Sequence, residues 1–174
     1  MNESIKRNII LVGFMGTGKT TVGKNIAGRL GMTFIDMDEI IEARQKKKIS
    51  AIFAENGEPF FRKLEKDLAF ELSRKHGIVV GTGGGIVLNP ENIANFSETG
   101  LVVCLTATPE VILKRLEHDT QRPLLAGEDK MKKITSILEK RAHLYEAVPH
   151  KVDTSSLTID DVVSRIIALY REKS

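Results

Sequence analysis

The segment GFMGTGKT at residues 13–20 has the residue types and the spacing of a loop that binds nucleotide phosphates. Its outer glycines, lysine and threonine match the pattern G-x-x-x-x-G-K-[ST], between an apolar segment and an amphipathic one. The glycines let the backbone curl so that its N–H groups point at the phosphates. We expect Lys19 to reach the β- and γ-phosphates and the Thr20 hydroxyl to ligate Mg²⁺. A glycine-rich turn without a ligand is the alternative.

Two aspartates follow the second apolar segment, in FIDMDEI at residues 34–40. The apolar segments at 78–80 and 101–105 end without an acid, so we look here for the aspartate that usually holds the metal beside such a loop. Asp36 and Asp38 are two residues apart and would face the same side of an extended chain. We assign Asp36 to Mg²⁺, through water, and Asp38 to the acceptor of the phosphate. The alternative for Asp38 is that it caps the following helix.

A glycine triplet and three arginines complete the set of candidate residues. The triplet is Gly83, Gly84 and Gly85, and it exposes backbone N–H groups and permits the close approach of a ligand. Arg62, Arg122 and Arg141 have planar guanidinium groups that suit a bidentate grip on a carboxylate or a phosphate. Glu65 lies three residues after Arg62, on the same helix face, and a turn-like segment follows Arg141. An exposed, solvated arginine is the alternative for each of them.

The elements that would position these residues alternate along the chain. Strand-like segments are expected at 9–12, 33–35, 78–80, 101–105 and 151–152, with amphipathic segments between them. Continuous apolar strands separated by helices predict a parallel sheet that helices cover on both faces, an α/β fold of three layers. Helices are expected to start at Asn89-Pro90 and Thr108-Pro109, and at a capping box of Thr158. After that box, positions 159, 162, 163, 166, 167 and 170 form one apolar stripe.

Two segments are interpreted as insertions into a single domain that spans residues 1–174. Residues 38–75 should form several helices between the second and third strands. Residues 117–130 are polar and rich in turn residues, with Arg122 in the middle, and resemble a mobile lid, although a surface loop is the alternative.

Composition narrows the function classes. The chain has 174 residues, 41% hydrophobic and 28% charged, and its apolar runs are too short to span a membrane. Cys104 is the only cysteine, which favours a core position and a cytoplasmic protein. The net charge of +3 is mild, and the run Lys46–Lys48 is interpreted as a solvated helix end because no aromatic residues interleave with it. Neither nucleic acid nor a membrane is expected as a partner, and we expect a monomer.

Taken in order, the segments GFMGTGKTT, FIDMDEI, FRKLE, TGGG, RPLL and RAHLY closely resemble those of the shikimate kinase family, over nearly the whole chain. The resemblance implies a P-loop fold like that of nucleoside monophosphate kinases. It also implies transfer of the ATP γ-phosphate, with Mg²⁺, to the 3-hydroxyl of shikimate, a step toward chorismate and the aromatic amino acids.

The resemblance also implies roles for individual residues. Asp38 would bind the ring hydroxyls and act as the base or orient it. Arg62, Arg141 and the glycine triplet would hold the acceptor and its carboxylate, with Glu65 orienting Arg62. Arg122 would reach from the lid to the phosphates, and Arg115 would stack on adenine. The ATP contacts would come from Gly13, Gly16, Thr17, Gly18, Lys19, Thr20, Thr21, Arg115 and Arg122, and the metal contacts from Thr20 and Asp36.

Rival interpretations remain. Another small-molecule kinase, for gluconate or a nucleoside monophosphate, would share the loop and the lid but would not need the D-x-D, FRKLE and GGG combination. A GTP-dependent switch protein is the rival outside metabolism, because HKVD at 150–153 partly matches the guanine-reading N-K-x-D motif. No aspartate is followed three residues later by glycine, as the switch motif D-x-x-G requires. An inactive nucleotide-binding module is the third possibility.

Overall fold

The computed structural model describes residues 6–118, 125 and 129–173. Five parallel strands form one sheet in the order β2-β3-β1-β4-β5. The strands are β1 (Asn8–Val12), β2 (Thr33–Asp36), β3 (Ile78–Gly81), β4 (Gly100–Thr106) and β5 (His150–Asp153). All five expected strands are therefore confirmed. The HKVD segment, which includes the strand expected at 151–152, forms β5 itself.

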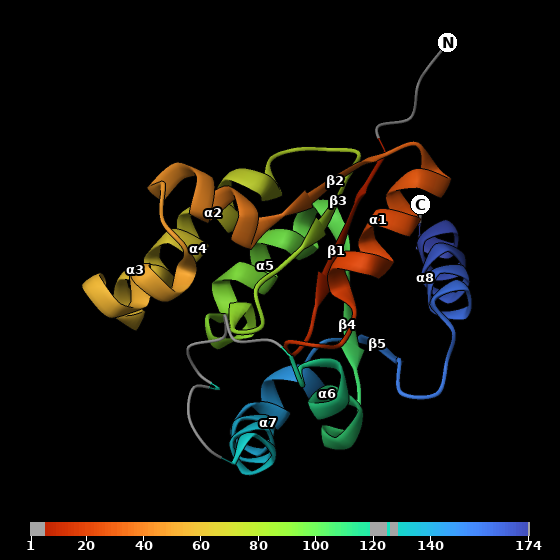
Figure 1. Ribbon diagram of the computed structural model, residues 1–174. Helices are drawn as coiled ribbons and strands as arrows, with labels where there is room; N and C mark the ends of the chain where they lie inside the picture. Colours follow the sequence, from red (N-terminus) through yellow and green to blue (C-terminus); the bar gives the residue numbers. More distant parts are fainter. Residues whose placement is uncertain (1–5, 119–124, 126–128, 174) are drawn as a thin grey trace.

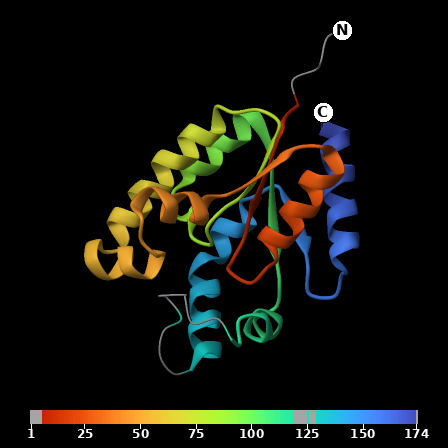
Figure 2. The same ribbon diagram turned by 45° about the horizontal axis from the view of Figure 1, so that its top comes forward.

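Helices cover both faces of this sheet, which confirms the three-layer α/β fold (Figures 1 and 2). Side chains alternate between the faces along β1, because successive residues of a strand point to opposite sides. Ile9 and Leu11 pack against α1 (Lys19–Leu30) and α8 (Ile159–Lys173), while Ile10 and Val12 join the larger core on the other face. Both faces of β1 and β4 are buried, which is why their sequences are apolar without interruption. Cys104 lies in this core, as expected.

The long connection between β2 and β3 contains three helices, as the sequence predicts for residues 38–75. They are α2 (Met37–Gln45), α3 (Ile49–Asn56) and α4 (Glu58–Ser73). Figure 1 shows α3 at the end of the molecule farthest from α8. The 3-10 helix η1 (Ile86–Leu88) and the helices α5 (Pro90–Thr99), α6 (Pro109–Arg115) and α7 (Lys130–Glu146) follow β3 and β4.

The expected helix starts are confirmed by side-chain caps. The side chains of Asn89 and Thr108 accept hydrogen bonds from the N–H groups of Glu91 and Val111. Thr158 and Asp161 cap each other at the start of α8. The apolar stripe of α8 is buried apart from its first member, because Ile159 sits at the helix end and is 48% exposed.

Two local expectations differ from the structure. The segment AHLYEAVP after Arg141 is turn-like only in its last three residues, because α7 continues through the first five to Glu146. Most of the lid expected at 117–130, including Arg122, lies outside the described residues. Among the helices that the structure describes, none has both the length and the apolar character needed to cross a lipid bilayer.

Because all strands are parallel, the segments that follow them meet at one edge of the sheet. The loop at residues 13–18 follows β1, Asp36 ends β2, and the glycine triplet follows β3. Thr154 comes directly after β5 at the same edge. The fold therefore brings residues from four distant parts of the sequence to one place.

Candidate active site

The loop after β1 has the backbone shape of a phosphate cradle. Gly13, Gly16 and Gly18 have φ angles of 140°, 76° and 99°, which residues with side chains rarely adopt. A Cβ atom on Gly13 would lie 2.2 Å from the carbonyl oxygen of Leu105 on β4, so only glycine fits there. The buried Thr17 hydroxyl donates to the carbonyl of Phe14 at 2.8 Å and closes the loop on itself. Helix α1 then begins at Lys19, so its N-terminus faces the cradle.

The ammonium group of Lys19 lies over this loop. Its Nζ donates to the carbonyl oxygens of Gly13 at 2.6 Å and Phe14 at 2.8 Å. An ammonium in this place can move to bound phosphate oxygens without crossing the cavity.

Thr20 and Asp36 lie side by side beneath the loop. The Thr20 hydroxyl is 3.1 Å from Asp36 Oδ2. One hydroxyl and one carboxylate are the hard oxygen donors that Mg²⁺ accepts, and Mg²⁺ fills its remaining positions with water and phosphate oxygens. The described residues contain no cluster of three or more His, Cys, Asp or Glu side chains that would form an all-protein metal site. This pair therefore fits a magnesium ion that arrives with a nucleotide.

The structure separates the two aspartates more than the sequence predicted. Strand β2 ends at Asp36, and Asp38 already lies in the first turn of α2, so the two side chains do not share one face of an extended strand. Asp36, and not Asp38, caps the helix, because its Oδ1 accepts from the N–H groups of Asp38 at 2.9 Å and Glu39 at 3.3 Å. Asp38 instead points toward the glycine triplet, where a Cβ atom on Gly83 would lie 3.2 Å from its Oδ1.

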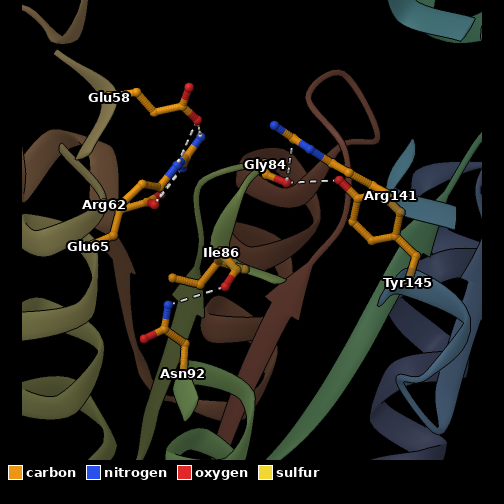
Figure 3. A network of polar contacts seen from close by, with 8 residues as sticks. All are labelled: Glu58, Arg62, Glu65, Gly84, Ile86, Asn92, Arg141 and Tyr145. Carbon is orange, nitrogen blue, oxygen red and sulfur yellow. Dashed lines mark hydrogen bonds and ion pairs between the residues drawn. The ribbon is translucent and has the colours of Figure 1, made fainter. Parts of the chain in front are cut away.

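Arg62 on α4 is held between two glutamates (Figure 3). Its Nη1 donates to Glu65 at 2.5 Å, and its Nε and Nη2 donate to Glu58 at 3.2 and 3.0 Å. Glu65 is buried, with 2% of its side chain exposed, whereas 44% of Glu58 is exposed. Burial raises the pKa of the Glu65 carboxyl, and the nearby Arg62 charge only partly opposes this. Glu65 orients Arg62 from inside, which the sequence predicted, and Glu58 holds it from outside.

The glycine triplet makes room for these side chains. A Cβ atom on Gly83 would lie 2.6 Å from Glu65 Oε1, and one on Gly85 would lie 2.4 Å from Arg62 Nη1. Cβ atoms do not come this close to other heavy atoms, so a side chain at either glycine would force Glu65 or Arg62 to move. The triplet therefore serves the neighbouring side chains as well as any ligand.

Arg141 and Tyr145 reach the same loop from α7. Both donate to the carbonyl oxygen of Gly84, Arg141 Nη1 at 3.4 Å and the Tyr145 hydroxyl at 2.8 Å (Figure 3). They are four residues apart and so share one helix face. The sequence analysis missed Tyr145, although its spacing from Arg141 was a usable signal once the segment was seen as helical.

Arg115, at the end of α6, lies beside the phosphate loop. It donates to the carbonyl of Gly16 at 3.1 Å and to Thr154 from both terminal nitrogens. Sequence reasoning missed Thr154 as well, because a single threonine after a strand has no distinctive pattern. Arg122 cannot be placed, since it lies outside the described residues.

One cavity of about 470 Å³ connects these groups, a volume typical of small-molecule sites. Predicted site residues that line it are Gly16, Gly18, Lys19, Thr20, Thr21, Asp36, Asp38, Arg62, Gly83, Gly84, Gly85 and Arg141. Gly13 and Thr17, which belong to the loop, and Arg115, which donates to the loop at Gly16, are not among the residues that line the cavity. Apolar side chains of α3 and α4, including Phe53 and Phe61, also line the cavity.

The fold and the loop define a P-loop protein, and Arg62 and Arg141 line the cavity beside the loop. The chain matches the family model described as Shikimate kinase over residues 15–171. A shikimate kinase of Caldanaerobacter subterraneus subsp. tengcongensis is 44% identical over 164 residues, 94% of this chain and 96% of that protein. The chain belongs to the shikimate kinase family.

Solved structures agree in fold. The shikimate kinase of Acinetobacter baumannii, solved in complex with shikimate, has a TM-score of 0.92 and 35% identity, and the match covers 97% of this chain and 95% of that one. A gluconokinase of Sinorhizobium meliloti has a TM-score of 0.62 at 18% identity, with 97% of this chain and 93% of that one covered, and shows the fold alone.

Proposed function

We propose that this protein transfers the γ-phosphate of MgATP to the 3-hydroxyl of shikimate and gives shikimate 3-phosphate and ADP, a step toward chorismate and the aromatic amino acids. The observation that carries the proposal is the continuity of one cavity from the phosphate loop, through Asp38, to Arg62 and Arg141. Such a cavity holds a donor phosphate and a carboxylated, hydroxyl-bearing acceptor in contact. Membership of the shikimate kinase family, and the shikimate bound to the Acinetobacter relative, support this acceptor.

In the donor half, the backbone of residues 13–18 and Lys19 hold the phosphates. Thr20 would hold Mg²⁺ directly, and Asp36 would hold it through water. A bound magnesium ion neutralises phosphate charge and fixes the geometry of the triphosphate. The face of the Arg115 guanidinium stacks on adenine, and Arg122 reaches the phosphates from the segment at 117–130. Thr21 and Gly18 complete the contacts at the start of α1.

In the acceptor half, Arg62 and Arg141 pair with the carboxylate and Asp38 accepts hydrogen bonds from the ring hydroxyls. The backbone of Gly83–Gly85 lies along the ring. Two arginines around a cavity that also contains Asp38 and Glu65 favour an acceptor with one acidic end and one hydroxylated end. Such an acceptor satisfies both kinds of group at once.

In the reaction, the acceptor oxygen bonds the γ-phosphorus while the bond from phosphorus to the β,γ-bridging oxygen breaks. Asp38 orients the hydroxyl and receives its proton late, because a loose phosphoryl-transfer transition state needs little early proton abstraction. Most of the rate enhancement then comes from positioning and from the positive charge of Lys19 and Arg122 around the transferring group.

The proposal extends to a monomeric, cytoplasmic protein that binds neither nucleic acid nor membranes. The lysine run at residues 46–48 supports the expectation that nucleic acid is not a partner, since Lys47 pairs with Glu55 and Lys48 with Glu42. Lysines that are paired with neighbouring glutamates do not form a strong basic surface.

The test is release of ADP from MgATP with shikimate, quinate, gluconate, AMP or CMP as the acceptor. We expect turnover with shikimate, and we expect Asp38→Asn to remove it while ADP binding is retained. Asp67→Asn is the matched control, because Asp67 is an exposed aspartate of α4 that does not line the cavity. Turnover with another acceptor alone would keep the fold and refute the substrate. Tight GTP binding without any turnover would favour the switch protein.

A further inference from the structure

Thr154 joins three segments that lie far apart in the sequence. It follows β5 directly and is 4% exposed. Its hydroxyl oxygen lies 3.0 Å from the carbonyl of Thr106, at the end of β4, and 3.1 Å from the carbonyl of Thr17 in the phosphate loop. Its own N–H donates to the Thr106 carbonyl at 2.8 Å. The residue therefore ties the phosphate loop to the ends of two strands.

Arg115 closes this arrangement from α6. Its Nη1 donates to the Thr154 hydroxyl oxygen at 3.0 Å and to the Gly16 carbonyl at 3.1 Å, and its Nη2 donates to the Thr154 carbonyl at 3.0 Å. A hydroxyl has one proton and two lone pairs, so Thr154 can accept from Arg115 and still donate to a carbonyl. Three hydrogen bonds from two nitrogens fix the plane of the guanidinium as well as its position.

We propose that Thr154 is a positioning residue for the nucleotide: it fixes Arg115 and the Gly16–Thr17 backbone in the geometry that binds ATP. The inference rests on the proposed function in taking ATP as the ligand of the loop. The backbone N–H groups that bind phosphate and the guanidinium face that binds adenine give the most affinity when they are already in place. Ordering them during binding would cost part of the binding free energy. The Thr154 hydroxyl supplies this order without contacting the ligand.

The bracket formed by Thr154, Arg115, Gly16, Thr17 and Thr106 belongs to the donor half alone. None of its described hydrogen bonds reaches α2, α4 or the glycine triplet, which carry the acceptor half. Loss of the Thr154 hydroxyl should therefore weaken the binding of ATP and leave the binding of the acceptor nearly unchanged. A residue that serves only general stability would affect both halves alike.

The experiment compares Thr154→Val, which keeps the shape and removes the hydroxyl, with Thr154→Ser, which keeps the hydroxyl. Calorimetry with MgADP and no acceptor measures nucleotide affinity, and steady-state kinetics give the KM for ATP and for shikimate separately. In the valine variant we expect ADP affinity to fall about tenfold and the KM for ATP to rise about tenfold, the effect expected when hydrogen bonds to a charged group are lost. The KM for shikimate should stay within about twofold, and serine should restore the ATP values.

Thr158→Val is the matched control. It removes a threonine hydroxyl that caps α8, so it lowers stability without touching the phosphate loop. Both KM values should remain at the wild-type level in this variant. If Thr154→Val does not fold, Thr154→Cys takes its place, because a thiol is a weak hydrogen-bonding group of similar size.

Wild-type ADP affinity in a folded Thr154→Val or Thr154→Cys variant would overturn the proposal. An equal loss for ATP and shikimate, or no recovery with serine, would reduce Thr154 to a structural residue. These outcomes are separate from failure of the proposed function. The binding measurement needs no acceptor, so it still decides the role of Thr154 if another molecule than shikimate receives the phosphate.

Discussion

The Arg62 guanidinium lies directly on the backbone of Gly85, at a distance that leaves no space for a side chain. A Cβ atom on Gly85 would be 2.4 Å from Nη1 and 2.5 Å from Nη2. Its Nη1 also donates to the buried carboxylate of Glu65, which holds the guanidinium in this place. The position of Arg62 thus depends on a glycine on a different segment of the chain, after β3.

Gly85→Ala should therefore displace Arg62 and weaken the binding of the acceptor while nucleotide binding is kept. A displacement of about 1 Å in a positioning group can cost on the order of 100-fold, so we expect a 10- to 100-fold rise in the KM for shikimate. Nucleotide affinity should change little, and the two are measured by steady-state kinetics and by ADP calorimetry. Gly28→Ala is the control, because nothing lies within 4 Å of its added Cβ and alanine favours α1. Equal KM values in both variants would contradict the packing argument.

Asp36 has two roles that a pair of substitutions can separate. Asparagine still accepts the hydrogen bonds that cap α2, but it lacks the charge that suits Mg²⁺. Asp36→Asn should keep wild-type thermal stability and require more Mg²⁺ for half-maximal activity. Asp36→Ala should show the same Mg²⁺ defect and also lose about 1 kcal/mol from the cap. A magnesium titration of activity, with thermal unfolding beside it, checks both; unchanged Mg²⁺ demand in Asp36→Asn would remove Asp36 from the metal site.

Glu65 gives the stability of the protein a characteristic pH dependence. Burial raises the pKa of its carboxyl above 4.5, so the folded state holds the proton more strongly than the unfolded state. Its contribution to the free energy of unfolding is therefore largest below pH 4.5 and declines as the pH rises through the higher folded pKa. The difference between wild type and Glu65→Gln in urea unfolding should fall with pH over this window.

Glu71, on the same helix, should contribute to stability with the opposite pH dependence, so Glu71→Gln is a matched comparison. A hydrogen bond from Arg44 lowers the pKa of Glu71, so its contribution is present above pH 4.5 and is lost as the pH falls. The difference between wild type and Glu71→Gln should rise with pH where that of Glu65→Gln falls. Parallel curves for the two variants would show that Glu65 is not perturbed by burial.

Tyr145 should strengthen the binding of the acceptor through one hydrogen bond, which holds the glycine triplet in place. Its hydroxyl donates to Gly84, and it shares this carbonyl with Arg141. Tyr145→Phe keeps the packing and removes a bond worth about 1 kcal/mol, which corresponds to a roughly fivefold rise in the KM for shikimate. The KM for ATP should not change. Loss of thermal stability without any change in either KM would limit Tyr145 to a structural role.

The sequence by itself determined the strands, the phosphate loop and three of the helix starts. These depend on local chemistry: apolar runs form β1 and β4, the glycines of residues 13–18 permit the positive φ angles, and Asn89 or Thr108 caps the helix next to it. The roles expected for Lys19 and Thr20 follow from the same local pattern. The ion pair of Arg62 with Glu65 was also predictable, because helical spacing puts residues three apart on one face.

Only the tertiary structure decided which of these residues meet. Asp36 and Asp38 do not share one face of a strand as their spacing suggested, and Asp36 is the cap of α2, because β2 ends and α2 begins between them. Tyr145 contacts Gly84 across 61 residues and Thr154 contacts Thr17 across 137, and no local pattern contains such distances. These contacts arise because parallel strands end at one edge and helices return across the sheet, so the geometry of the cavity is a property of the packed fold.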